Sequence, residues 1–205
     1  MHRSIYAASI TLLFATQVWA ASPSPMNSAP PARTEWRVLE PLSVEPGAAT
    51  LQVASQAPMF SYIGAEGRWH RSDELLSHGP IIILFAPEDR DLAAVEHLAA
   101  AFAELGVRPI AVMDMPTRGS SAVSRRLKLT TTLVSDPMSA IANLYHSVDA
   151  RTGRHAAAYF VVDSRRVLRA MHFGPLPPAE LMLASAARCL GRPLPEATLP
   201  TSEAR

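Results

Sequence analysis

The sequence predicts a single α/β domain with a central mixed β-sheet flanked by helices. Apolar, β-branched runs alternate with segments whose apolar residues recur at helical spacing, and two consecutive extended runs joined by a short turn come late in the chain. A hydrophobic content of 48% is enough for a packed core and argues against wholesale disorder. The predicted domain covers residues 51–192 and contains no internal repeats.

The first half of this domain predicts a strand, a helix and a second strand. Residues 81–85 (IIILF) form a continuous apolar run, which is typical of a strand buried on both faces. Residues 92–105 carry apolar side chains at helical spacing, and Gly106 suits the end of that helix. Residues 109–113 (PIAVM) predict the next strand.

The second half ends in a pair of strands and a last helix. Its predicted elements are a short helix at 120–127, extended chain at 131–135, a helix begun by Asp136 and Pro137, strands at 159–162 and 167–173, and a helix after Pro178. This order is that of a thioredoxin-like fold, although the pattern alone also allows a flavodoxin-like one. The late pair of strands favours the thioredoxin type.

Residues 1–20 have the features of a secretory signal peptide. Arg3 gives a basic start, residues 5–15 form an apolar run, and Val18-Trp19-Ala20 offers a cleavage site after Ala20. An uncleaved anchor is the alternative, but the run is too short to span a bilayer. We therefore expect a periplasmic or secreted protein with no stable membrane anchor after cleavage.

The segments on either side of the domain are rich in proline and small residues. Residues 21–50 contain the sequence SPSP and a Pro-Pro pair, which predicts a flexible linker. Residues 193–205 contain three further prolines and predict a flexible tail.

Charge and cysteine content exclude several classes of function. Loss of Arg3 with the signal peptide leaves 18 basic residues against 18 acidic ones, so nothing favours nucleic acid or an anionic membrane as partner. Cys189 is the only cysteine, which excludes an intramolecular disulfide, a Cys-x-x-Cys centre and a cysteine-based zinc site. An exported domain without a disulfide fits a bacterial periplasm.

Four segments resemble the peroxiredoxin branch of the thioredoxin-like fold, the alkyl hydroperoxide reductase and thiol-specific antioxidant family. They are residues 57–60 (APMF) with 67–69 (GRW) and 72–75 (SDEL), residues 79–87 (GPIIILFAP), residues 133–137 (LVSDP) with 140–145 (AIANLY), and residues 159–163 (YFVVD). The first segment resembles the family's opening hairpin and short helix, with Ser72 expected as the helix N-cap. The resemblance spans about 140 residues and implies a peroxide-reducing or thiol–disulfide ancestor.

The residues that the family uses for chemistry are missing. The resemblance implies a thiolate in the first turn of the helix after Pro87, in a Pro-x-x-x-Thr-x-x-Cys motif, and an arginine three residues before the phenylalanine of a later strand. Asp91 stands in the hydroxyl position, Ala94 in the cysteine position and Ala157 in the arginine position. The chain is therefore predicted to lack the peroxidatic site.

Acidic residues occupy the start of that helix instead. Glu88, Asp89 and Asp91 lie where a helix dipole stabilises negative charge by about 0.3–1 kcal/mol each. We interpret them as capping residues; the alternative is that they and Arg90 bind a cation, a basic ligand or a partner loop. The candidate ligand or partner pocket comprises Pro87, Glu88, Asp89, Asp91 and Ala94.

Three functions remain open at this point. The leading hypothesis is a redox-inactive redoxin domain that binds an unknown protein partner, without cofactor or metal and in an unspecified oligomeric state. The first alternative is a thiol peroxidase that uses Cys189, which we expect instead to be a core residue of the last helix. The second is a metal carrier that uses Met113, Met115 and the Met171-His172 pair, which packing explains more simply.

Overall fold

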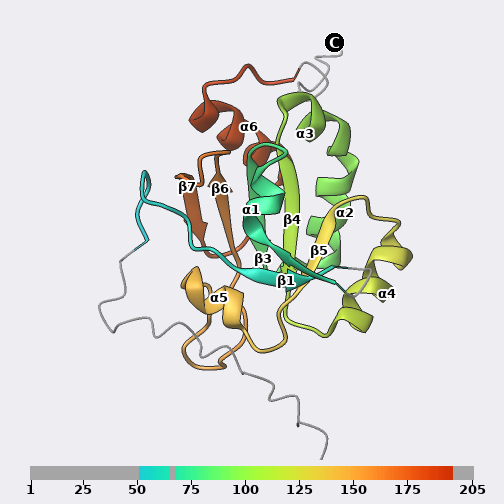
Figure 1. Ribbon diagram of the computed structural model, residues 1–205. Coiled ribbons are helices and arrows are strands. Elements are labelled where there is room, and N and C mark those ends of the chain that lie inside the picture. The colour runs from blue at the N-terminus through green and yellow to red at the C-terminus, as the bar shows by residue number, and fades with distance from the viewer. Residues whose placement is uncertain (1–50, 65–67, 196–205) are drawn as a thin grey trace, which may run out of the picture. The chain divides into compact units, whose positions relative to one another are not determined.

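A five-stranded mixed sheet forms the centre of the part of the chain that the computed structural model describes, residues 51–64 and 68–195 (Figure 1). The sheet has the order β5-β4-β3-β6-β7. Its strands are β3 (Ile81–Phe85), β4 (Arg108–Met113), β5 (Thr132–Ser135), β6 (Ala158–Val162) and β7 (Leu168–Phe173). β3 pairs parallel with β4 and antiparallel with β6, so the predicted mixed sheet and thioredoxin-like fold are confirmed. The signal peptide, the linker and residues 196–205 of the tail lie outside the described residues.

Strand β3 is the most deeply buried element of the sheet. All five of its side chains are buried, as the continuous apolar run predicts. Ile81, Ile83 and Phe85 face one hydrophobic cluster, and Ile82 and Leu84 face the other. The alternation of side chains along a strand thus places helices or loops against both faces.

Three helices cover one face of the sheet: α2 (Asp89–His97), α3 (Ala99–Leu105) and α6 (Ala179–Leu190). Helix α4 (Thr117–Leu127) lies beside β5 and packs Val123 and Leu127 against the same cluster. No helix among the described residues has the length and apolar character that crossing a bilayer requires.

A two-stranded hairpin and two short helices cover the other face. Strands β1 (Ser61–Ile63) and β2 (Trp69–Arg71) pair antiparallel, and α1 (Ser72–Leu76) follows directly. Helix α5 (Ala140–Leu144) is followed by the buried Tyr145, whose hydroxyl donates to the carbonyl of Pro58 over 3.1 Å. The N-terminal hairpin implied by the resemblance is present.

Three helices differ from the sequence prediction. Helix α5 begins at Ala140, with Ser139 as its N-cap, rather than at Asp136 and Pro137. The helix expected over residues 92–105 is broken at Leu98, whose N–H is shared between the carbonyls of Ala94 and Val95 at 3.3 and 3.1 Å. Gly106, at φ 68°, ends α3 in the left-handed conformation as expected. Helix α4 begins at Thr117 rather than at residue 120, with Pro116 as its N-cap.

The expected N-cap at Ser72 is wrong. Arg71 is the N-cap of α1, and Ser72 is the first residue inside the helix. The Ser72 hydroxyl instead accepts a hydrogen bond from the N–H of Phe60 over 3.1 Å, in a buried position. Ser72 therefore ties the helix to the chain that enters β1, a long-range contact that local pattern does not encode.

Candidate functional site

The chain turns sharply between β3 and α2, at the position where the family motif begins. Ala86 adopts a φ of 48°, and Pro87 and Glu88 lead into the helix, with Glu88 as N-cap. The Asp91 carboxylate accepts a hydrogen bond from the N–H of Glu88 over 2.8 Å. The residue in the hydroxyl position thus closes the first turn of α2.

The other acids at this helix start also have partners within the chain. Asp89 forms a two-pronged ion pair with Arg126 of α4 at 2.7 and 3.0 Å, and this hydrogen bonding lowers the pKa of Asp89. Glu88 lies 3.1 Å from Arg90. Capping and ion pairing within the chain therefore account for all three acids.

Ala94 lies in the second turn of α2, not in the first turn that the resemblance implied. The helix already begins at Asp89, so Ala94 is five residues further along. Its methyl group is half-buried against the cluster shared by α2, α3 and α6. A side chain here is beyond the first turn, where the helix dipole acts most strongly.

An open cleft of about 690 Å³ lies at the carboxyl ends of β3 and β4. Pro87 and Ala157 line it, whereas Glu88, Asp89, Asp91 and Ala94 are not among its described lining residues. The lining combines residues that follow β3 and β4, the loop before β6 and the end of β7: Ala86, Pro87, Met113, Asp114, Met115, Asp149, Thr152, Arg154, His155, Ala156, Ala157, Phe173, Gly174 and Pro175.

An ion pair that the sequence reasoning missed lies on the cleft wall. Arg154 donates to Asp114 over 2.9 Å, and this hydrogen bond lowers the pKa of the Asp114 carboxyl. Asp114 directly follows β4, and Arg154 is three residues before Ala157. Because ligands of open α/β sheets bind beyond the carboxyl ends of the strands, the position of Asp114 was an available signal.

A second, buried pair lies behind the cleft. Nε2 of His155 donates to the backbone carbonyl of Asp136 over 3.2 Å and lies 3.1 Å from the Asp136 carboxylate, and the two side chains are only 1% and 4% exposed. The same carboxylate oxygen accepts the N–H of Ala142 over 2.9 Å. Nδ1 of His155 has no hydrogen-bond partner among the described residues. This pair joins the start of α5 to the loop before β6.

The single thiol has the properties of a packing residue. Cys189 is half-buried on α6, and its Sγ donates to the carbonyl of Ala186 over 3.5 Å. Burial raises the pKa of the Cys189 thiol, which reduces the thiolate that would attack a peroxide. Cys189 is not among the described residues that line the cleft.

The soft metal ligands considered from the sequence do not converge. Met113 and Met115 pack against the core cluster next to the cleft. His172 stacks on Tyr159 with ring centroids 5.4 Å apart and contacts the carbonyl of Pro175 at 3.0 Å. Within residues 51–64 and 68–195, no three His, Cys, Asp or Glu side chains are placed to hold a metal ion.

Comparison with known families identifies the family of this chain. Residues 53–171, more than half of the sequence, match the AhpC/TSA family. The chain belongs to the AhpC/TSA family. No curated protein matches this AhpC/TSA member.

Solved peroxiredoxins share its fold. Peroxidoxin BcpB from Mycobacterium tuberculosis superposes with a TM-score of 0.62 at 18% identity, over 69% of this chain and 97% of that one. AhpC from Enterococcus faecalis gives 0.60 at 16% identity, over 68% and 92%. The mitochondrial 2-Cys peroxiredoxin from Plasmodium falciparum gives 0.57 at 14% identity, over 68% and 93%. Identities this low show the fold, while function has to be argued from the site.

Proposed function

We propose that this protein is an exported, redox-inactive member of the AhpC/TSA family that acts in the periplasm as a binding or assembly module. The single observation that carries the proposal is Ala94, which stands where the family has its nucleophilic cysteine. A methyl group has no electron pair with which to attack an O–O bond. Peroxidase chemistry at this position is therefore lost.

The surroundings of Ala94 support the same conclusion. The Asp91 carboxylate is hydrogen-bonded to the N–H of Glu88 in the first turn of α2, and Ala157 presents no positive charge to the cleft. A substitution of one residue could be compensated by a neighbour. Three positions that cooperate in one reaction have changed together, so the remaining geometry supports binding rather than catalysis.

The cleft is the surface that we assign to the partner. It combines apolar groups, Met115 and Phe173 among them, with the Asp114–Arg154 pair and the Thr152 hydroxyl. Phe173 is 49% exposed, so its ring is accessible to a partner that enters the cleft. A volume of about 690 Å³ can accept one or two side chains of a partner protein.

A peroxide-consumption assay tests the loss of chemistry. With a thiol reductant present, we expect the purified protein to consume hydrogen peroxide no faster than the reductant alone. Cys189→Ser is the matched control, because it removes the only thiol. Turnover by the native chain that disappears in Cys189→Ser would establish the alternative, a peroxidase that uses Cys189.

Site-specific cross-linking in cells tests the cleft as the partner surface. A photoreactive residue at position 173 should capture one specific partner, whereas one at the more exposed Leu181, outside the cleft lining, should not. Ala157→Leu, which narrows the cleft, should weaken the capture at 173. Capture at position 181 but not at position 173 would show that the partner binds outside the cleft.

The proposed export has its own test. Mass spectrometry of the protein recovered from a periplasmic fraction should show an N-terminus at Ala21. Full-length protein in the cytoplasmic fraction would contradict the signal-peptide interpretation without affecting the argument about Ala94.

A further inference from the structure

A second hollow, separate from the cleft, lies between the β1–β2 hairpin, helix α4 and strand β5. It has a volume of about 510 Å³. Its described lining contains none of the residues that line the cleft. We refer to it as the hydroxyl groove, because serine and threonine side chains of α4 and of the chain around β5 make up most of its lining.

The face of helix α4 that borders this groove carries hydroxyl side chains in place of apolar ones. Its only fully buried residue is Ser120, whose hydroxyl is 2.8 Å from that of Ser135 in β5. Thr117, Ser121 and Ser124 line the groove and are half-buried, and their side-chain hydroxyls have no hydrogen-bond partner among the described residues. Each hydroxyl can donate one hydrogen bond and accept two. The groove therefore offers unused hydrogen-bonding capacity on a rigid helix.

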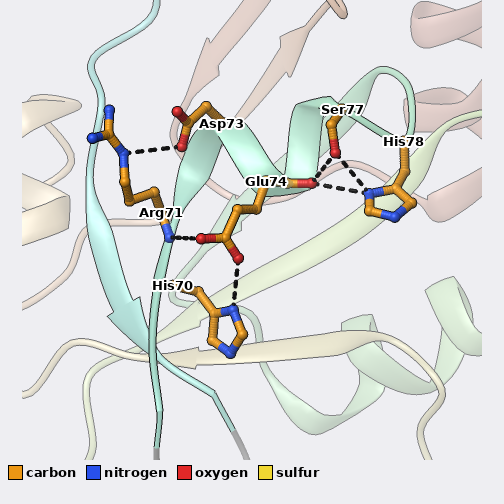
Figure 2. Close-up of polar contacts among 6 residues, drawn as sticks. All are labelled: His70, Arg71, Asp73, Glu74, Ser77 and His78. Atoms are coloured by element: carbon orange, nitrogen blue, oxygen red, sulfur yellow. Dashed lines mark hydrogen bonds and ion pairs between the residues drawn. The ribbon is translucent and has the colours of Figure 1, made fainter.

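The opposite wall is aromatic. The rings of Tyr62 and His70 stack with centroids 5.4 Å apart and an interplanar angle of 27°. Figure 2 shows how His70 is held: its Nδ1 contacts the Glu74 carboxylate at 2.8 Å, and the second oxygen of that carboxylate accepts the N–H of Arg71 over 3.3 Å. Hydrogen bonds from these groups lower the pKa of Glu74, with His70 the largest contributor. The wall is thus fixed before any ligand arrives.

The charge of the groove is low and positive. Among its described lining residues, Arg125 is the only one with a permanent charge, and it forms no ion pair with another described residue. A phosphate-binding site would be expected to present several cations or a fan of backbone N–H groups. One guanidinium at the edge of an otherwise uncharged groove matches a ligand with a single carboxylate.

From these observations we infer that the hydroxyl groove binds a saccharide that carries a carboxylate, a uronic acid in its simplest form. A sugar ring presents hydroxyls at its rim and C–H groups on its faces. The hydroxyls would meet Thr117, Ser121 and Ser124, and a C–H face would lie toward the Tyr62–His70 wall. Arg125 would pair with the carboxylate. This site is independent of the cleft and of the function proposed for it.

Titration of the ¹⁵N-labelled protein with glucuronic acid and with glucose tests the inference. The two sugars differ in a carboxylate against a hydroxymethyl group. We expect saturable shifts of amide resonances from α4 and the β1–β2 hairpin at millimolar glucuronic acid. Because an exposed ion pair contributes about 0.2–1 kcal/mol, glucose should bind about 1.4- to fivefold more weakly.

Variants separate binding at the groove from binding elsewhere. The triple variant Thr117→Val, Ser121→Ala, Ser124→Ala removes hydroxyls without adding bulk, and it should abolish the saturable shifts while the other amide resonances stay in place. Arg125→Gln should remove the preference for glucuronic acid over glucose. Ser185→Ala and Arg188→Gln, matched changes on α6, should leave binding unchanged.

The outcomes are distinct. Absence of saturable shifts with either sugar, or equal binding by the triple variant, would overturn the site. Equal affinity of the native protein for glucose and glucuronic acid would overturn the carboxylate assignment. Shifts confined to residues of the cleft would show that the sugar binds there instead.

Discussion

Two neighbouring residues on one loop, Arg154 and His155, make the same kind of contact in opposite surroundings. Arg154 reaches Asp114, the residue after β4, on the wall of the open cleft. His155 reaches Asp136, the residue after β5, and both of these side chains are almost completely buried. In each pair a carboxylate that follows the carboxyl end of a strand lies within 3.1 Å of a nitrogen of the same loop.

The two pairs differ in whether solvent can take the place of a lost partner. The Arg154 side chain is 74% exposed, so solvent can solvate the guanidinium whenever the pair opens. Asp136 and His155 are almost completely shielded from solvent, so a polar atom that loses its partner there is not compensated by bulk water. The exposed pair is therefore suited to exchange with a ligand, while the buried pair holds the wall of the cleft in place.

Breaking the buried pair should have the largest effect. We expect Asp136→Ala to lower the free energy of unfolding by roughly 3–5 kcal/mol, because it removes the buried carboxylate beside His155 and the acceptor for the N–H of Ala142. Denaturant unfolding measures the change. Asp136→Asn keeps the shape and one acceptor and should cost less; an equal loss in both variants would mean that the negative charge, not the acceptor or the packing, is the main contribution.

Glu96 on α2 lies between these extremes and should have an intermediate effect. Its carboxylate accepts hydrogen bonds from the N–H groups and the hydroxyls of Thr130 and Thr131, at 2.6–3.1 Å. We expect Glu96→Gln to lower the free energy of unfolding by about 1–2 kcal/mol at neutral pH, since an amide cannot accept all four bonds. Thr130→Val with Thr131→Val serves as the reciprocal control.

The effect of Glu96 should depend on pH. Burial raises the pKa of Glu96, but the hydrogen bonds from Thr130 and Thr131 outweigh it, so the pKa lies below its ordinary value of 4.5. The folded state then binds the proton less readily than the unfolded state, and acid favours unfolding. The difference in stability between the native chain and Glu96→Gln should be full above pH 4.5 and shrink below it; a constant difference would contradict this linkage.

The exposed pair should matter least for stability and most for the cleft. We expect Asp114→Asn to change the free energy of unfolding by less than about 1 kcal/mol, because the pair is solvated. The same variant frees Arg154 and should alter cross-linking from position 173. A large loss of stability with unchanged cross-linking would show that the Asp114–Arg154 pair supports the fold and takes no part in binding.

Much of the fold follows from local pattern. Ile81 to Phe85 had to be a buried central strand because five consecutive apolar, mostly β-branched residues cannot leave either face in water. Gly106 had to end a helix because it adopts a φ of 68° without strain. The break at Leu98 and the role of Ser72 did not follow, since both depend on contacts formed only when the elements pack together.

The candidate site divides in the same way. The absence of a thiol near α2 is a matter of counting, because no fold can supply a cysteine that the chain does not contain. Which of the surrounding residues share a cavity depends on tertiary structure: the acids Glu88, Asp89 and Asp91 turn to their own helix and to neighbouring arginines. Pro87 and Ala157 meet Asp114 and Arg154 across the cleft, from segments that the sequence separates by dozens of residues.

The sequence by itself therefore determined the class of fold, the family resemblance and the loss of the nucleophile, because these depend on residue types and their local spacing. Only the tertiary structure decided which polar groups are buried, which are exposed and which are left without a partner. Those properties depend on what the packed elements exclude from water, and the spacing of residues along the chain does not contain that information.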